Sequence, residues 1–258
     1  MVDDSYGSAT DFETMFTFLH KEFFPRCAFG PLYLKGVKSH FFYPSLEFLG
    51  LEGCLDGLRP SLKKRDQILG WRTPESQEEV EAFCYLTPFL RRFIPGRAEL
   101  CRILLDRDGT GKDFQWTTDK ENAFGLVKQA IAENAMAGPD PKLQFHMAVD
   151  ASKKAMGGVL FQLHGQPAGT EAGPEHRSAK RIICFFSFKL MDAETRYSNS
   201  EREALAVVWG LAEVKWMISA SPHPTFVYTD HEAISNIRTF RLKRPDVSDG
   251  SGGSDGTS

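Results

Sequence analysis

The sequence predicts a mixed α/β sheet with one helical crossover in its carboxyl-terminal half, preceded by a mostly helical region. Apolar and polar residues alternate over 145–150, and apolar strand-like segments follow at 157–161 and 182–188. Residues 201–218 are apolar on nearly every side, as in a buried helix, and 225–229 again have strand character. Three strands, a helix and a further strand require one crossover, which makes the sheet mixed.

The residues before this sheet carry helix and turn signals. Apolar side chains recur at helical spacing over 12–24, and Pro25 is predicted to end that helix. The Phe-Leu-Gly-Leu segment at 48–51, followed by Gly53 and Gly57, predicts a short hairpin. Three more helices are expected, the second entered through Thr73 and Pro74, at 61–70, 74–93 and 119–133.

Composition restricts the class of protein. The 258 residues suffice for one or two domains, and 41% hydrophobic with 25% charged residues is typical of globular chains. A net charge of −3 argues against coating nucleic acid by bulk charge, although a local basic groove stays open. Five widely spaced cysteines without a Cys-x-x-Cys pair disfavour a disulfide framework or a zinc knuckle.

The chain also lacks targeting and membrane signals. No run of about 18 apolar residues exists, and the first four residues are acidic where a signal or transit peptide is basic. We therefore expect an intracellular protein, cytoplasmic or nuclear, that is not secreted and does not contact a membrane. Residues 244–258 are rich in Gly, Ser and Asp, which predicts a disordered tail.

Three carboxylates fall at informative places in the predicted sheet. Asp150 ends the first strand, Asp230 ends the fourth, and Glu203 lies in the first turn of the helix between them. If the first and fourth strands are neighbours, the two aspartates approach each other, and a helix crossing the sheet can bring Glu203 to the same point. Clustered carboxylates repel unless cations neutralise them, and their oxygens suit Mg²⁺. Two such ions activate water in phosphodiester cleavage.

Each carboxylate also has a purely structural interpretation. Asp150, with Ala and Ser after it, is compatible with a turn in which the aspartate bonds the nearby backbone. Ser200 and Glu203 match the spacing of a capping box. Asp230 could cap a short following helix. Residue spacing alone leaves the metal site and these alternatives open.

Ten short motifs resemble those of gypsy-type long-terminal-repeat retrotransposon reverse transcriptases, in the family's order and over most of the chain. Met-Val-Asp-Asp resembles the Tyr-x-Asp-Asp palm motif, and Phe-Leu-Gly resembles the hairpin that grips the primer. The later motifs resemble the thumb, the connection and the ribonuclease H domain of the same elements. The motifs lie at 1–5, 48–51, 70–74, 91–95, 114–117, 150–152, 186–190, 197–198, 203–209 and 228–231.

The resemblance implies a fold and a site. The fold class is a ribonuclease H-like mixed sheet with helices, preceded by a palm remnant and a thumb/connection region. Asp150, Glu203 and Asp230 correspond to three of the four carboxylates that bind Mg²⁺ (or Mn²⁺), with Glu201 a neighbour of the ligand. The implied activity is hydrolysis of the RNA strand of RNA–DNA hybrids. The expected domains are a palm remnant at 1–57, a helical thumb/connection at 58–110, a truncated ribonuclease H-like domain at 111–240 and a tail at 241–258.

The sequence departs from the family at both ends. Asp3 and Asp4 resemble two polymerase carboxylates, but fingers and the remaining carboxylate are missing, so we expect no polymerase activity from this chain alone. The fourth aspartate of the family's ribonuclease H site also has no counterpart here. Asp246 and Asp249 lie too near Asp230 and in a Gly- and Ser-rich segment, so we do not assign that role to either. Two alternatives to an active nuclease therefore stay open. One is an inactive nucleic-acid-binding relic of the same polyprotein, and the other is a remnant that does not fold.

Basic residues cluster in the thumb-like part of the sequence. By resemblance they lie beside an RNA–DNA hybrid or a template-primer duplex, where they would contact phosphates, and an ordinary solvated helix face is the alternative. The candidates are Arg59, Lys63, Lys64, Arg65, Arg91 and Arg92. Two further expectations concern the sheet: His146, which alternates away from the apolar residues, is predicted at the surface or an edge, and Trp209 and Trp216 in the core.

Overall fold

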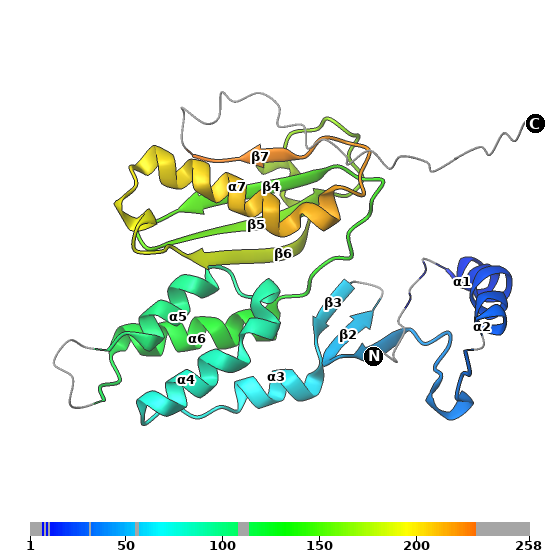
Figure 1. Ribbon diagram of the computed structural model, residues 1–258, viewed down its shortest axis with the longest axis horizontal. Helices are drawn as coiled ribbons and strands as arrows, with labels where there is room; N and C mark the ends of the chain where they lie inside the picture. The colour runs from blue at the N-terminus through cyan, green and yellow to red at the C-terminus, as the bar shows by residue number, and fades with distance from the viewer. Residues whose placement is uncertain are drawn as a thin grey trace, which may run out of the picture.

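The computed structural model describes residues 11–30, 32–54, 57–107 and 114–230, together with Gly7 and Ala9 (Figure 1). These residues form a lower unit of helices with a small sheet and an upper unit in which one sheet packs against a long helix. Asp3, Asp4 and the predicted tail lie outside the described residues. None of the described helices is both long and apolar enough to span a bilayer.

The first helical segment continues through Pro25, so the prediction that this proline ends it is wrong. Helix α1 (Phe12–Phe18) leads into a π-helical turn, η1 (Leu19–Phe23), and then into α2 (Phe24–Phe29). In the π turn the Phe24 N–H donates to the Leu19 carbonyl, five residues back. A proline ring collides with the carbonyl four residues before it in a regular helix, and the wider turn removes that conflict.

The predicted hairpin is confirmed and has a third strand. Strands β1 (Ser45–Phe48), β2 (Leu51–Cys54) and β3 (Gly57–Pro60) form an antiparallel sheet in that order. Leu49 and Gly50 join β1 to β2 with φ values of 51° and 76°. Positive φ at both central residues matches the twist of a two-residue hairpin.

Five helical segments follow the small sheet. They are α3 (Leu62–Leu69), α4 (Gln77–Leu86), the 3₁₀ helix η3 (Pro88–Phe93), α5 (Arg97–Leu105) and α6 (Thr118–Glu133). Ser76, rather than Thr73, caps α4 by accepting the Glu79 N–H, and α5 was not predicted. Thr117 caps α6 by accepting the Lys120 N–H.

The helices of the lower unit share one apolar core. Its most deeply buried side chains come from α4, η3 and α6 and include Val80, Phe83, Phe93, Val127 and Ile131. The core extends along the chain to Met136, whose backbone pairs with Leu58 of β3. Helix α6 therefore packs with the lower unit.

The upper unit contains the predicted mixed sheet. Its strands run in the order β6-β5-β4-β7, and their bounds are β4 (Phe145–Ala151), β5 (Ala155–Leu163), β6 (Lys180–Lys189) and β7 (Phe226–Tyr228). Strand β7 pairs with β4 in parallel, and the other pairs are antiparallel. The crossover before β7 contains helix α7 (Asn199–Ile218), which lies across one face of the sheet (Figure 1).

Close contacts fix α7 on that face. A Cβ atom on Gly210 of α7 would lie 3.1 Å from the sulfur of Met147 and from the ring of Phe186. Within the sheet, a Cβ on Gly158 would lie 2.4 Å from the Phe186 ring, so only glycine fits there. Small residues at these two positions let the helix and the strands approach each other.

The predictions for His146, Trp209 and Trp216 are wrong, and Trp209 is 39% exposed. His146 is 2% exposed, its ring stacks on Phe161 at 5.3 Å, and its Nδ1 lies 3.0 Å from the Tyr228 hydroxyl. His146 and Tyr228 lie on the face of the sheet opposite α7. The loop after β5 covers that face, since the Ala172 N–H donates to the Tyr228 hydroxyl. Trp216 is 67% exposed, because it lies on the side of α7 that faces away from the sheet.

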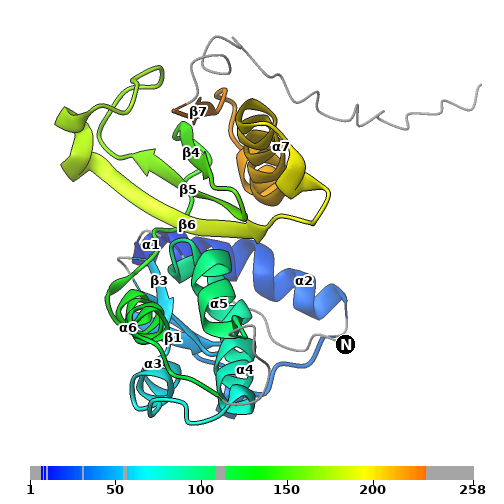
Figure 2. The same ribbon diagram turned by 90° about the vertical axis from the view of Figure 1, so that its left-hand side faces the viewer.

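The two units meet along β6, the edge strand of the upper sheet. The hydroxyl of Ser187 in β6 accepts the Ala98 N–H in the first turn of α5 at 2.9 Å. Gly96, the N-cap residue of α5, has no side chain to cap the helix, so Ser187 satisfies one of the free N–H groups of its first turn. Figure 2 shows α5 directly beneath β6. Arg91 of η3 adds an ion pair with Glu213 of α7 at 2.7 Å.

Candidate metal centre

The parallel pairing of β4 and β7 brings two aspartates to one edge of the sheet. Ala148 stands opposite Tyr228 in the register of these strands. Asp150 lies two residues after Ala148, and Asp230 lies two residues after Tyr228. Because the two strands are parallel, the two aspartates reach the same end of the sheet at the same height. Both side chains are exposed. The condition under which the two aspartates approach each other, that the first and fourth strands are neighbours, is therefore met.

The N-terminal turn of α7 supplies the third carboxylate. Ser198 caps this helix by accepting the Glu201 N–H, and the Glu201 carboxylate in turn accepts the Ser198 N–H at 2.7 Å. The capping box therefore uses Ser198 and Glu201, so the alternative that assigned this role to Ser200 and Glu203 is wrong. Glu203 lies half a turn further on, faces the sheet and is 2% exposed.

The three carboxylates converge on one point. One oxygen from each of Asp150, Glu203 and Asp230 lies within 4.8 Å of the other two. The side-chain hydrogen bonds of the turn after β4 are made by Ser152 and not by Asp150. The Ser152 hydroxyl donates to the Ala155 carbonyl and accepts the N–H groups of Lys154 and Ala155. The alternative in which Asp230 caps a following helix involves residues outside the described part of the chain.

Both oxygens of Glu203 are held in place. The Ala151 N–H donates to Oε1 at 3.3 Å, and the Thr229 hydroxyl donates to Oε2 at 3.5 Å. Burial raises the pKa of the Glu203 carboxyl, and the negative charges of Asp230 and Asp150 raise it further, against the opposing hydrogen bonds. In this position the ionised form of Glu203 is therefore destabilised relative to its protonated form.

This donor set fits a divalent cation. In the part of the chain that the structure describes, no lysine or arginine forms an ion pair with any of the three carboxylates. Three negative groups at this separation repel one another, and a cation between them removes the repulsion. Carboxylate oxygens are the ligands of Mg²⁺ and Mn²⁺ in proteins.

The predicted basic residues lie elsewhere, in the lower unit. Arg59 in β3 pairs with Glu52 at 2.8 Å, and Arg91 pairs with Glu213, so both charges are partly neutralised. Lys63 on α3 is exposed, and the remaining three side chains, Lys64, Arg65 and Arg92, are half-buried. The structure thus brings the carboxylates together but does not gather the basic residues around them.

Sequence reasoning missed the two groups that hold Glu203. Ala151 contributes only its backbone, and no residue type signals such a contact. Thr229 directly precedes Asp230 at the end of the fourth strand, so a contact between its hydroxyl and the cluster could have been predicted from the sequence. Alternation along the strand turns Thr229 to the opposite side from its neighbours, toward the helix that covers the sheet.

Comparisons with known proteins agree with this geometry. Residues 140–248 match the family described as an RNase H-like domain found in reverse transcriptase. The Tf2-3 and Tf2-4 transposon polyproteins of Schizosaccharomyces pombe are each 25% identical to this chain over 201 residues, which is 78% of the chain. The match covers 14% of each polyprotein, so the chain spans a small part of these relatives.

Solved structures share the fold. The foamy viral protease-reverse transcriptase in complex with RNA/DNA hybrid aligns with a TM-score of 0.56 and 17% identity, over 74% of this chain and 24% of that chain. The complex with dsDNA aligns with a TM-score of 0.57 and 18% identity, over 80% of this chain and 40% of that chain. At these identities the likeness establishes the fold.

Proposed function

We propose, from the premise that residues 140–248 are an RNase H-like domain of a retrotransposon-type polyprotein, that this domain hydrolyses the RNA strand of RNA–DNA hybrids with Mg²⁺ or Mn²⁺. The observation that carries the proposal is the convergence of Asp150, Glu203 and Asp230 within 4.8 Å. The hybrid bound by a structural neighbour of the same fold supports the choice of substrate. Gypsy-type ancestry, which the sequence motifs favour, belongs to the same proposal.

The chain's own residues act by position and charge. Asp150 and Asp230 present exposed carboxylates at the end of the sheet, where a phosphodiester backbone can reach them. Glu203 presents its carboxylate from the first turns of α7, and hydrogen bonds from Ala151 and Thr229 fix the orientation of that carboxylate. Asp150, Glu203 and Asp230 would hold a divalent ion, which when bound would lower the pKa of water and offset the charge of the phosphate.

Cleavage of a labelled hybrid tests the proposal. Purified chain is incubated with Mg²⁺ and two hybrids, one labelled on the RNA strand and one on the DNA strand. We expect cuts in the RNA strand alone and a rate at least about a hundredfold lower for Asp150→Asn, because that change removes one of three metal ligands. Glu201→Gln is the matched control, since Glu201 lies beside the site without joining it. Wild-type protein as inert as the Asp150→Asn variant would contradict the proposal.

Duplex binding without cleavage is the second candidate function. It is favoured by Lys63 on α3, which is exposed and forms no ion pair with any residue that the structure describes. Binding through phosphates weakens steeply with salt. Salt-dependent hybrid binding by wild-type protein that leaves the RNA uncut with either metal would select this function over hydrolysis.

A further inference from the structure

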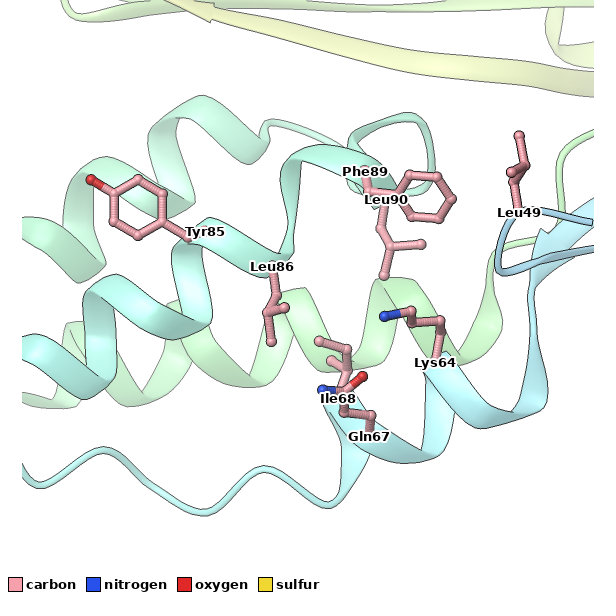
Figure 3. Close-up of a pocket in the computed structure, with 8 residues that line it drawn as sticks. All are labelled: Leu49, Lys64, Gln67, Ile68, Tyr85, Leu86, Phe89 and Leu90. Atoms are coloured by element: carbon pink, nitrogen blue, oxygen red, sulfur yellow. The ribbon is translucent and has the colours of Figure 1, made fainter. Parts of the chain in front are cut away.

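A cavity of about 350 Å³ lies in the lower unit, apart from the carboxylates. It opens between the β1–β2 turn, helix α3 and the segment from α4 into η3 (Figure 3). Its volume falls within the range of small-molecule sites, which is roughly 300–1,000 Å³.

The floor of the cavity is apolar and buried. Ile68 of α3 and Leu90 of η3 form it and are 2% and 1% exposed. Leu86 and Phe89 continue the apolar wall on the α4 side. Ile68 and Leu90 belong to the core of the lower unit and Leu86 packs against it, so this part of the hydrophobic surface is present before any ligand binds.

The β1–β2 turn closes one end of the cavity. Leu49 lines it, and a Cβ atom on Gly50 would lie 3.5 Å from Lys64 Cγ and 3.6 Å from the ring of Phe89. The turn therefore packs against the stem of Lys64, which limits the directions in which that side chain can extend.

Among the described residues that line the cavity, Lys64 alone carries a full charge. Figure 3 shows its amine directed into the space between Ile68 and Leu90. Among the described residues no carboxylate forms an ion pair with it. An apolar floor with one unpaired cation above it complements a ligand that has an apolar body and one negative group.

We propose that this cavity binds a small amphipathic anion, an aromatic or alkyl carboxylate whose apolar body rests on Ile68, Leu86 and Leu90 and whose carboxylate accepts from Lys64 Nζ. The site is separate from the proposed nuclease and needs no metal. Its test therefore succeeds or fails independently of hybrid cleavage.

Calorimetric titration with naphthoate, in EDTA, tests the proposal. Wild-type protein is compared with Lys64→Gln and with Lys63→Gln, a control one residue away on α3 that is exposed and does not line the cavity. We expect Lys64→Gln to weaken naphthoate binding about tenfold, as loss of a charge-assisted hydrogen bond does, and Lys63→Gln to leave it within about twofold.

Naphthalenemethanol, the neutral analogue, separates the charge from the cavity. It should bind wild-type protein and Lys64→Gln with the same affinity, which also demonstrates that the variant keeps its fold. Equal naphthoate affinities for wild-type protein and Lys64→Gln would overturn the proposal. So would equal losses in Lys63→Gln and Lys64→Gln, or no saturable binding of naphthoate by wild-type protein.

Discussion

Ser198 and Glu201 bond to each other reciprocally, and this pair determines which glutamate of α7 belongs to the carboxylate cluster. The Ser198 hydroxyl accepts the Glu201 N–H, and the Glu201 carboxylate accepts the Ser198 N–H at 2.7 Å. The backbone hydrogen bond from Ser198 lowers the pKa of the Glu201 carboxyl, while burial raises that of Glu203. Two glutamates two residues apart therefore differ in environment and in role.

Glutamine substitutions at these two positions should separate capping from metal binding. Mg²⁺ that binds only the folded state raises the melting temperature of wild-type protein. We expect Glu201→Gln to keep this Mg²⁺-dependent increase, because residue 201 lies outside the cluster, and Glu203→Gln to lose most of it. Differential scanning calorimetry with and without Mg²⁺ measures both. An increase retained in full by Glu203→Gln would contradict the assignment.

The raised pKa of Glu203 predicts a pH dependence of stability in the absence of metal. The folded state holds the proton more tightly than the unfolded state, so the free energy of unfolding falls as pH rises from the ordinary carboxyl pKa to the raised one. Glu203→Gln removes this fall. Urea unfolding in EDTA from about pH 4 to about pH 8 should show the variant more stable than wild-type protein at neutral pH and no more stable at the acid end. Parallel curves would contradict the prediction.

His146 predicts a pH dependence of the opposite sign. Burial, with a smaller effect of the Lys180 charge, lowers its pKa to about 4 from 6.5. The unfolded state takes up the proton first, so stability is lost as pH falls from 6.5 toward 4, by about 3 kcal/mol at most. His146→Phe retains a stacking ring and should lose this acid sensitivity. The Tyr228 hydroxyl keeps its Ala172 partner in that variant. A wild-type stability that stays level over this interval would refute the prediction.

Adjacent glycines of β5 offer a matched test of packing under α7. Gly158→Ala places a Cβ 2.4 Å from the Phe186 ring and 2.7 Å from the Ala148 carbonyl oxygen, so we expect a loss of about 1–3 kcal/mol. Gly157→Ala meets its neighbours at 3.5 Å or more and should change stability by less than about 1 kcal/mol. Urea unfolding of the two variants compares them directly, and equal losses would contradict the packing described.

Much of the upper sheet could be predicted because its signals are local. Alternation over 145–150 and the apolar run at 201–218 identify β4 and α7, and a helix between strands implies a crossover. The pairing of β7 with β4 could not be predicted, because a crossover alone does not determine which strand becomes the neighbour. The choice of glutamate could not be made from spacing, since Ser-x-x-Glu occurs both at Ser198 and at Ser200. Only the packing of α7 on the sheet decides between them.

The failed predictions have physical causes that local patterns do not contain. His146 alternates with apolar residues as a solvent-facing side chain would, but a loop beginning some twenty residues later covers that face. Pro25 ends a helix under the usual rule, and the π turn at Leu19–Phe23 evades it. Both outcomes depend on contacts or backbone geometry outside the local residue pattern.

The most direct test of the central claim is Mn²⁺ binding, followed by electron paramagnetic resonance, in wild-type protein, Asp150→Asn and Asp230→Asn. The account predicts saturable binding in wild-type protein and a loss of at least about tenfold in affinity for each variant, because carboxylates from two strands share one ion. Combining both changes should cost less than the sum of the two, as expected for ligands of a single site. Unchanged Mn²⁺ affinity in the double variant would show that these oxygens do not hold a metal together.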